Sequence, residues 1–263
     1  MASRNTIERS YNNLLSRLMR TNAKRLSPYF NRQGRRILKK FRNVSLQQQP
    51  IDIVNDLVDW EEEEEELTAV LNDMADDSYK SGVRFATRFT DDLTTSSEIV
   101  AGGLATYTAV NIARAVASII RTTRKKLADN VRKGLAEEES REEISKRLNR
   151  TMTIASTSRA RTIAETETHN AINAGSFDTA LLGLVLIGGV EGLSRSGVAT
   201  KIWNTQRDER VREPPRYLAN HVVLDRQRIP ITDKFSNGLL FPGDAANGPP
   251  EEIIRCRCYL TYE

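Results

Sequence analysis

Two cysteines near the C-terminus are the most reactive side chains in the sequence. Cys256 and Cys258 are the only cysteines, and on a strand both side chains would point to the same side. Residues two apart give poor disulfide geometry. A zinc site needs four ligands, and the only histidines are His169 and His221. We therefore predict two small apolar thiols packed in a reducing compartment, with no metal and no cofactor.

An acidic residue among arginines is the next candidate site. Asp208 stands close to Arg210 and Arg212, and such a group could hold a phosphate or polarise a carbonyl. The structural alternative is that the alternating charges form bidentate pairs and fix the loop against the turn that ends at Asp244. A small loop-rich module needs such fixing. We predict no catalytic residue, and structural roles for Trp203, Asp208, Arg210, Arg212, Asp244, Cys256 and Cys258.

Two further motifs suggest an enzyme only superficially. Ser156-Thr-Ser158 and Glu165-Thr-Glu167 are similar to the S-T-S and E-x-E elements of arginine-specific ADP-ribosyltransferases. In that fold the elements lie on separate strands, tens of residues apart, whereas here six residues separate them within a segment of helical composition. An ADP-ribosyltransferase-like enzyme is therefore a remote alternative. An N-cap followed by an exposed acidic turn is the simpler interpretation.

Charge is distributed in blocks that the net value of +4 conceals. Residues 1–50 carry twelve Lys and Arg against one acid, and residues 51–100 carry fifteen Asp and Glu against three bases. Such blocks indicate charged partners or mutual neutralisation within the fold. The basic block could bind DNA phosphates or an acidic protein surface, such as residues 52–77 of a neighbouring copy. The predicted contact residues are Arg32, Arg35, Arg36, Lys39, Lys40 and Arg42.

Helical periodicity dominates the first half of the chain. It predicts a first helix that is interrupted at Ser27-Pro28 and a linker at Gln47-Gln-Gln-Pro50. A long helix should follow, with the run Glu61–Glu66 either as a solvated face or as a docking surface for a basic partner or for the chain's own basic arm. Its apolar seam has heptad-like spacing, with Glu64 at the one missing position: Ile53, Leu57, Trp60, Leu67, Leu71 and Met74.

Later segments combine helices with short strands. A helix from about Ala105 to Leu135 should turn Val110, Ala113, Ala117, Ile120, Leu127 and Val131 inward. Ser140-Arg-Glu-Glu143 is a capping box that should begin a short helix, and a further helix is predicted from Ser156 to Ala174. The expected strands are Val222–Leu224, Ile229–Ile231 and Cys256–Thr261.

These elements predict an α+β fold, with a long helical N-terminal half and a small mixed α/β C-terminal module. The expected segments are a basic helical arm (1–50), a helical domain with a long acidic helix (51–195) and the module (196–263). The longest apolar stretch, residues 180–190, is shorter than a membrane span. The N-terminus lacks an apolar signal region, and we therefore expect synthesis and use in a cytoplasm.

Short motifs follow one another in a specific order near the C-terminus. A K-x-W-x-T-x-x-D-x-R-x-R stretch from Lys201 to Arg212 leads through Pro242-Gly-Asp244 to Cys256-Arg-Cys258. This order resembles the C-terminal module of the Mu F-like minor head (head-morphogenesis) proteins of tailed bacteriophages. The resemblance covers about the last hundred residues and says little about the first half. In that family a histidine commonly follows the last arginine by three positions, where this chain has Pro215; His221 is the available substitute.

The resemblance implies a structural minor head protein, not an enzyme. Such a protein enters the procapsid, associates with the portal vertex, and contacts packaged DNA or affects its ejection. The implied partners are the portal protein, the scaffolding or major capsid protein and double-stranded DNA, with multiple copies and no membrane. Its place would be the capsid interior or portal vertex of the virion, and the host cytoplasm during assembly. The alternative is a head-tail connector or a virion protein that binds DNA by charge alone.

Overall fold

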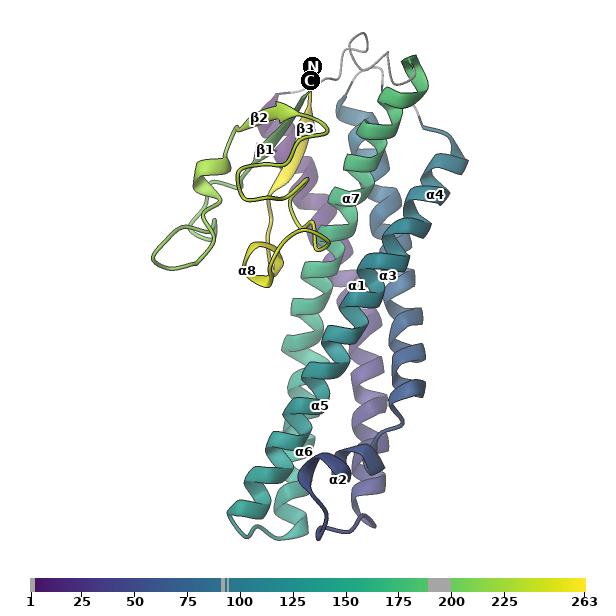
Figure 1. Ribbon diagram of the computed structural model, residues 1–263, viewed down its shortest axis with the longest axis vertical. Helices are drawn as coiled ribbons and strands as arrows, with labels where there is room; N and C mark the ends of the chain where they lie inside the picture. Colours follow the sequence, from purple (N-terminus) through teal and green to yellow (C-terminus); the bar gives the residue numbers. More distant parts are fainter. Residues whose placement is uncertain (1–2, 91–92, 94, 189–199) are drawn as a thin grey trace. The chain divides into compact units, whose positions relative to one another are not determined.

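The computed structural model describes residues 3–90, 93, 95–188 and 200–263. It has the predicted α+β fold: long helices make up the first part, and a small three-stranded antiparallel sheet lies near the C-terminus (Figure 1). The described chain divides into two compact units. Unit 1 comprises Met1–Met19, Met74–Asn111 and Glu165–Glu263, and unit 2 comprises Arg20–Asp73 and Ile112–Ala164.

The two units cut across the segments expected from the sequence. Three helices contribute residues to both units: α1 (Arg4–Phe41), α3 (Trp60–Phe89) and α7 (Ala160–Gly188). The boundary between the compact units therefore does not fall at residue 50, where the charge composition changes. The other expected boundary, between residues 195 and 196, lies outside the described residues.

The predicted interruption at Ser27-Pro28 is wrong, because α1 runs through Pro28 for 38 residues. A proline inside a helix removes one backbone hydrogen bond. Its neighbours Leu26, Tyr29 and Phe30 are completely buried in unit 2, and this packing offsets the loss. The apolar side chains around the proline therefore decide the conformation of this segment.

The expected long acidic helix is two helices instead. Helix α2 spans Pro50–Leu57, and α3 begins at Trp60. Between them the side chain of Asp59 accepts a hydrogen bond from the backbone N–H of Glu62 at 3.1 Å, as an N-cap residue does. The new start changes which glutamate points inward: Glu63 is buried, and Glu64 is exposed.

A π-helical turn changes the phase of the next helix. Helix α4 (Ser97–Tyr107) continues through η1 (Thr108–Ile112) into α5 (Ala113–Ala136). A π-turn adds one residue to a helical turn, and residues after it are therefore rotated relative to an uninterrupted helix. The predicted inward residues Val110, Ala113 and Ala117 are exposed, whereas Ile112, Val116 and Ile119 are buried. The predicted Leu127 and Val131 are buried as expected.

The stretch Ser97–Ala136 is also long and apolar enough, by length and composition alone, to cross a membrane. Only 17% of its most apolar window is buried. This criterion is weak evidence for a membrane span, since other long apolar helices meet it too. The first part of the stretch, α4, is largely exposed and has Glu98 as its only charged residue.

The predicted capping box is confirmed. The Ser140 hydroxyl accepts from the backbone N–H of Glu143, and the Glu143 carboxylate accepts from the backbone N–H of Ser140. Helix α6 (Arg141–Ile154) begins there and buries Ile144 and Leu148. A second π-turn, η2 (Ala155–Arg159), leads into α7.

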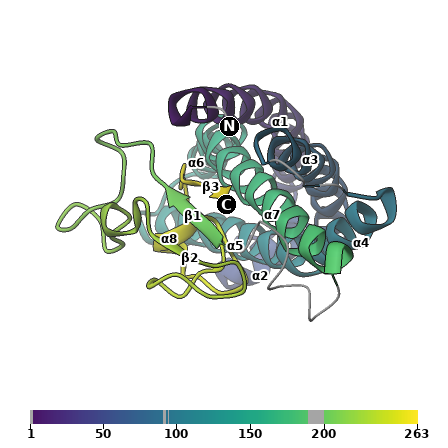
Figure 2. The same cartoon turned by 90° about the horizontal axis from the view of Figure 1, so that it is seen from above.

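The sheet has the order β2-β1-β3, with both pairs antiparallel. Its strands are β1 (Thr200–Asn204), β2 (Arg228–Pro230) and β3 (Tyr259–Tyr262), which lie beside α7 in both views (Figures 1 and 2). Phe177 and Ala180 of α7 share a core cluster with Trp203 and Leu260. The predicted strand Val222–Leu224 is a 3-10 turn, η4.

Two glycines bring α3 and α7 close together in unit 1. A Cβ atom on Gly82 would lie 2.0 Å from the carbonyl oxygen of Ile172, and one on Gly175 would lie 2.2 Å from that of Tyr79. Neither distance is possible for real atoms. The helix crossing that supports the sheet therefore requires glycine at both positions.

Candidate functional site

Strand β1 anchors the motif-rich region through two buried residues. Trp203 is fully buried, and its ring meets Phe235 and His221 edge-on, with centroids 5.0 and 5.4 Å apart. Lys201 is also fully buried. Its Nζ donates to the carbonyl oxygen of Leu240 at 2.8 Å and lies over the rings of Phe177 and Phe235.

Arg212 holds two backbone segments together. The guanidinium, 7% exposed, donates to the carbonyl oxygens of Glu252 and Ile254. The carbonyl oxygen of Arg212 in turn accepts from the backbone N–H of His221 at 2.8 Å. This backbone hydrogen bond closes the loop formed by residues 213–220, and His221 therefore lies beside Arg212 in space.

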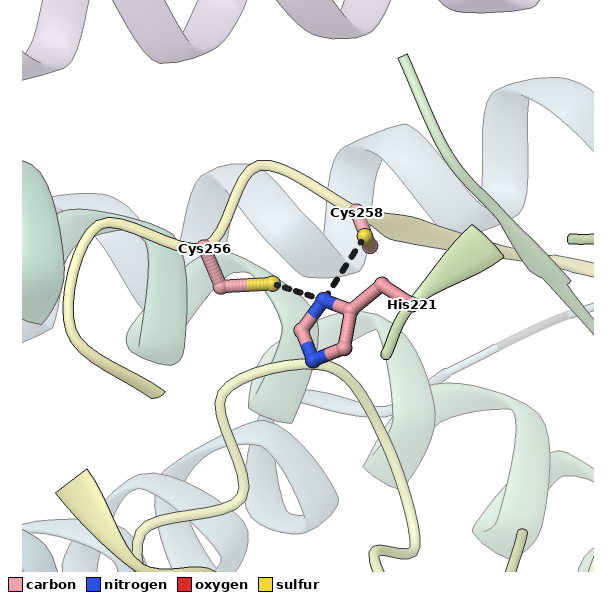
Figure 3. Close-up of side chains that lie close together, drawn as sticks. All are labelled: His221, Cys256 and Cys258. Atoms are coloured by element: carbon pink, nitrogen blue, oxygen red, sulfur yellow. Dashed lines mark hydrogen bonds between the residues drawn. The ribbon is translucent and has the colours of Figure 1, made fainter. Parts of the chain in front are cut away.

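This loop brings His221 to the two cysteines, as Figure 3 shows. Nδ1 of His221 lies 3.7 Å from Sγ of Cys256 and 3.5 Å from Sγ of Cys258. The three ligand atoms are within 4.8 Å of one another, and all three residues are buried. Both cysteines lie in the segment between α8 (Pro250–Ile253) and β3. The prediction that they lie on a strand is therefore wrong.

The other nitrogen of the His221 ring faces a carboxylate. Nε2 lies 2.8 Å from Oε2 of Glu252, and the same oxygen accepts from Nδ2 of Asn237 at 2.9 Å. An ionised carboxylate only accepts hydrogen bonds, and Nε2 therefore carries the proton. In the neutral ring Nδ1 then presents its lone pair to the two sulfur atoms, and in the protonated ring, which the raised pKa of His221 favours, Nδ1 donates to a thiolate.

Charge in this cluster favours one thiolate. Burial alone raises the pKa of Cys256, but hydrogen bonds from Cys258, His169 and His221 outweigh it and lower that pKa well below the ordinary value. At Cys258, burial and the neighbouring Cys256 raise the pKa. Burial lowers the pKa of His221, while contacts with Cys256 and Glu252 outweigh that effect and raise it. The two thiols therefore differ in charge although they are only two residues apart.

The predicted charge pairs have other partners. Asp208 accepts from Nη2 of Arg257, with both carboxylate oxygens within 2.7 Å, and the Arg210 side chain is exposed. Asp208 and Arg212 thus do not pair with each other or reach the turn at Asp244. The prediction missed these partners because the sequence does not show that the segment after Ile253 returns beside residue 208.

Asp244 closes its own turn. The side chain is 2% exposed and accepts from the backbone N–H groups of Leu240 and Asn247 and from the amide of Asn247. Gly243 has φ +83°, a conformation that favours glycine. Of the seven residues predicted to be structural, Asp208 and Arg210 are exposed, and the other five are buried: Trp203, Arg212, Asp244, Cys256 and Cys258.

The basic arm meets its own acidic segment within unit 2. Arg36 pairs with Glu63 at 2.6 Å and with Glu66 at 2.7 Å, and Arg32 pairs with Glu66. The other four predicted contact residues are exposed and have no acidic partner in the part of the chain that the structure describes: Arg35, Lys39, Lys40 and Arg42. The six predicted cations thus form two groups with different roles.

The sequence analysis named His221 as a substitute for the family's histidine, but it did not predict three features of the structure. Glu252 has no signal in sequence, since its partner is 31 residues away. The role of His221 was obscured because a loop separates it from Arg212. Within unit 1, Arg17, Arg84 and Arg88 line a cavity of about 530 Å³ between α1 and α3; their helical spacing on α3 was the available signal.

The enzyme-like motifs lie on helical backbone. Ser156–Ser158 fall in the π-turn η2, and Glu165–Glu167 fall on α7. In the transferase fold the corresponding elements lie on strands, so this placement does not reproduce it.

Comparison with known proteins gives one finding. The family described as phage Mu protein F like protein matches residues 125–261, a range that includes His221, both cysteines and the Asp208–Arg212 segment. No curated protein and no solved structure matches the chain.

Proposed function

Because the chain belongs to the family of phage Mu protein F-like proteins, we propose that it is a structural minor head protein that associates with the portal vertex inside the procapsid. The family match over residues 125–261 carries this proposal, since the family supports a role in phage head morphogenesis. The family is structural, and no catalytic role is assigned to the chain. Several copies gather at the vertex, where the portal protein is the principal partner.

Two surfaces support association with other molecules. Arg35, Lys39, Lys40 and Arg42 offer free positive charge at the end of α1, which suits an acidic protein surface. The exposed surface of α4 suits a contact that does not depend on charge, because Glu98 is its only charged residue. A portal contact that uses both would weaken only partly as salt increases.

Pull-down of purified portal protein tests the principal claim. We expect binding at low salt that persists, although weakened, at high salt. Complete loss of binding at high salt would favour charge attraction without portal specificity. Image reconstruction of particles should place the protein at the unique vertex, and a uniform distribution over the shell would contradict the proposal.

A second candidate function is contact with packaged double-stranded DNA. The free cations on α1 and the arginine-lined cavity between α1 and α3 favour it, because binding to phosphates needs positive charge alone. Removing one cation that binds a phosphate should reduce the slope of log affinity against log salt by about 0.9. Binding to random-sequence duplexes over a salt series measures this slope.

A matched pair of variants separates local binding from net charge. The test variant replaces the four free cations of α1 with glutamine. The control removes four exposed cations elsewhere in unit 2 and has the same net charge: Arg121, Lys125, Lys126 and Lys146. If the α1 residues bind DNA, only the test variant should show reduced affinity and a reduced slope. Equal reductions in both variants would show that binding follows net charge.

A further inference from the structure

The three donors around Nδ1 of His221 have the spacing of metal ligands. Zinc binds sulfur at about 2.3 Å and nitrogen at about 2.0 Å, and tetrahedral angles then place the two donors about 3.5 Å apart. The observed nitrogen–sulfur distances are 3.5 and 3.7 Å. The three donor atoms lie within 4.8 Å of one another, whereas two sulfur atoms on one zinc ion are about 3.8 Å apart, so the two thiols must move closer together to share an ion.

Hydrogen bonding alone explains the arrangement less well. A single ring nitrogen makes one hydrogen bond along its lone-pair direction, yet both sulfur atoms converge on Nδ1 of His221. The proton on Nε2 points to Glu252. A carboxylate behind a histidine is the usual outer contact of a zinc ligand, because it fixes the tautomer and turns the lone pair toward the metal.

The surroundings suit zinc bound by two thiolates. A dication with two thiolates has no net charge and can be buried. The indole N–H of Trp203 is buried without a hydrogen-bond partner among the described residues, and its ring lies against that of His221. A cavity of about 10 Å³ adjoins the sulfur atoms, next to Gln206 and Arg212. That is the space of about one water molecule, which could serve as the fourth ligand.

We propose that His221, Cys256 and Cys258 bind one Zn²⁺ per chain through Nδ1 and the two sulfur atoms, with Glu252 orienting the histidine and a water molecule completing the site. This reverses the expectation from sequence that no metal is bound. The ion links the end of the loop 213–220 to the segment before β3, which are 35 residues apart. Its role is to stabilise the C-terminal sheet region, since the cavity is too small for a substrate.

Metal titration of the full-length protein tests the proposal. Protein freed of metal by chelation under reducing conditions is titrated with Co²⁺ and then Zn²⁺. We expect one Co²⁺ per chain, thiolate-to-cobalt charge-transfer absorption that zinc displaces, and a higher unfolding temperature with zinc. Elemental analysis of the purified protein should also find one zinc per chain. A folded wild-type protein that binds neither ion, or that contains copper in place of zinc, would overturn the proposal.

Variants identify the ligands. His221→Gln, Cys256→Ser and Cys258→Ser should each lower zinc affinity more than Glu252→Gln, which should lower it about 10- to 100-fold. Glu251→Gln is the control, since Glu251 is the exposed carboxylate next to Glu252 on α8. It should keep one zinc per chain. Unchanged affinity in His221→Gln, or equal losses in His221→Gln and Glu251→Gln, would refute the three-ligand assignment.

A measurement on the wild-type chain tests the site even if the variants do not fold. Both thiols are alkylated with and without zinc, and the products are quantified by mass spectrometry. Zinc should slow alkylation of Cys256 and Cys258 together, because both sulfur atoms bind the ion. Protection of one cysteine alone, or of neither, would contradict the proposed site.

Discussion

Lys201 is a charged side chain with no exposed surface. Burial lowers its pKa to about 8, although Asp233 and Asp244 act in the opposite direction. One hydrogen bond to a carbonyl oxygen and two aromatic rings replace the water that the ammonium loses on folding. At neutral pH the buried ammonium of Lys201 therefore lowers the free energy of unfolding.

Stability should therefore rise with pH where Lys201 loses its proton in the fold. Its pKa of about 8 lies below the ordinary value of 10.5, and the unfolded chain binds more protons between these values. The free energy of unfolding should increase by about 1 kcal/mol between pH 8 and pH 9. Urea unfolding at several pH values measures it. Lys201→Met should lack this increase, and an identical pH profile in the variant would refute the assignment.

Glu63 and Glu64 are neighbours with opposite environments. Glu63 is 2% exposed and accepts hydrogen bonds from Gln33 and Arg36, whereas Glu64 is exposed. Glu63→Ala removes the carboxylate acceptor of the buried Gln33 amide and one of the two carboxylates that pair with the half-buried Arg36, and it should lower the free energy of unfolding by about 2 kcal/mol. Glu64→Ala should change it by less than about 0.5 kcal/mol. Denaturant titration compares them, and equal effects would show that the buried hydrogen bonds contribute little.

At the level of elements, local signals were reliable where residues act on their near neighbours. The Ser140–Glu143 capping box predicted the start of α6 because both of its hydrogen bonds are formed within four residues. The break at Asp59 and the continuation through Pro28 were missed. The continuation through Pro28 is decided by side chains buried against other segments, and sequence periodicity contains no information on that packing. The break is marked by the local N-cap hydrogen bond between Asp59 and Glu62, a signal that periodicity does not include.

The phase of α5 shows a different limit. Heptad and helical spacing assume that every turn has the same number of residues, and the π-turn at Thr108–Ile112 violates that assumption. Val110 was therefore assigned to the core and is 45% exposed. The type of element was predicted correctly, but the buried face was not.

The crossing of α3 and α7 yields a prediction at the same scale. Gly175→Ala places a methyl group against the Tyr79 carbonyl oxygen and should lower the free energy of unfolding by about 2 kcal/mol or more. Gly102→Ala on α4 meets nothing within 4 Å and should raise it by about 0.5 to 1 kcal/mol, because alanine favours helix. Thermal unfolding of both variants checks the difference. If Gly175→Ala is also stabilising, the close crossing does not occur.

At the scale of the whole molecule, the opposite charge blocks are partly joined within unit 2 by Arg32, Arg36, Glu63 and Glu66. The sequence left open whether these blocks neutralise each other or bind partners. Arg32 and Arg36 pair with acids of the same chain, whereas Lys39 and Lys40 on the same helix have no acidic partner among the described residues. The cluster of one histidine and two cysteines near the C-terminus could not be predicted from the sequence. His221 reaches Cys256 and Cys258 through a loop whose closure depends on a backbone hydrogen bond to Arg212.

The exposed surface of α4 and η1 should bind protein and not lipid. The uncharged run between Glu98 and Arg114 has fifteen residues, fewer than the roughly 20 that span a bilayer. Extending the span would place Arg114 inside it, at a cost of about 2.5 to 3.5 kcal/mol near the centre.

In flotation assays, the protein should therefore remain unbound with neutral phosphatidylcholine vesicles. Anionic vesicles serve as the control, because free cations such as Lys39 and Lys40 should bind them at low salt and release them at high salt. Flotation with neutral vesicles that survives high salt would contradict this prediction and would identify α4 and α5 as a membrane-inserting segment.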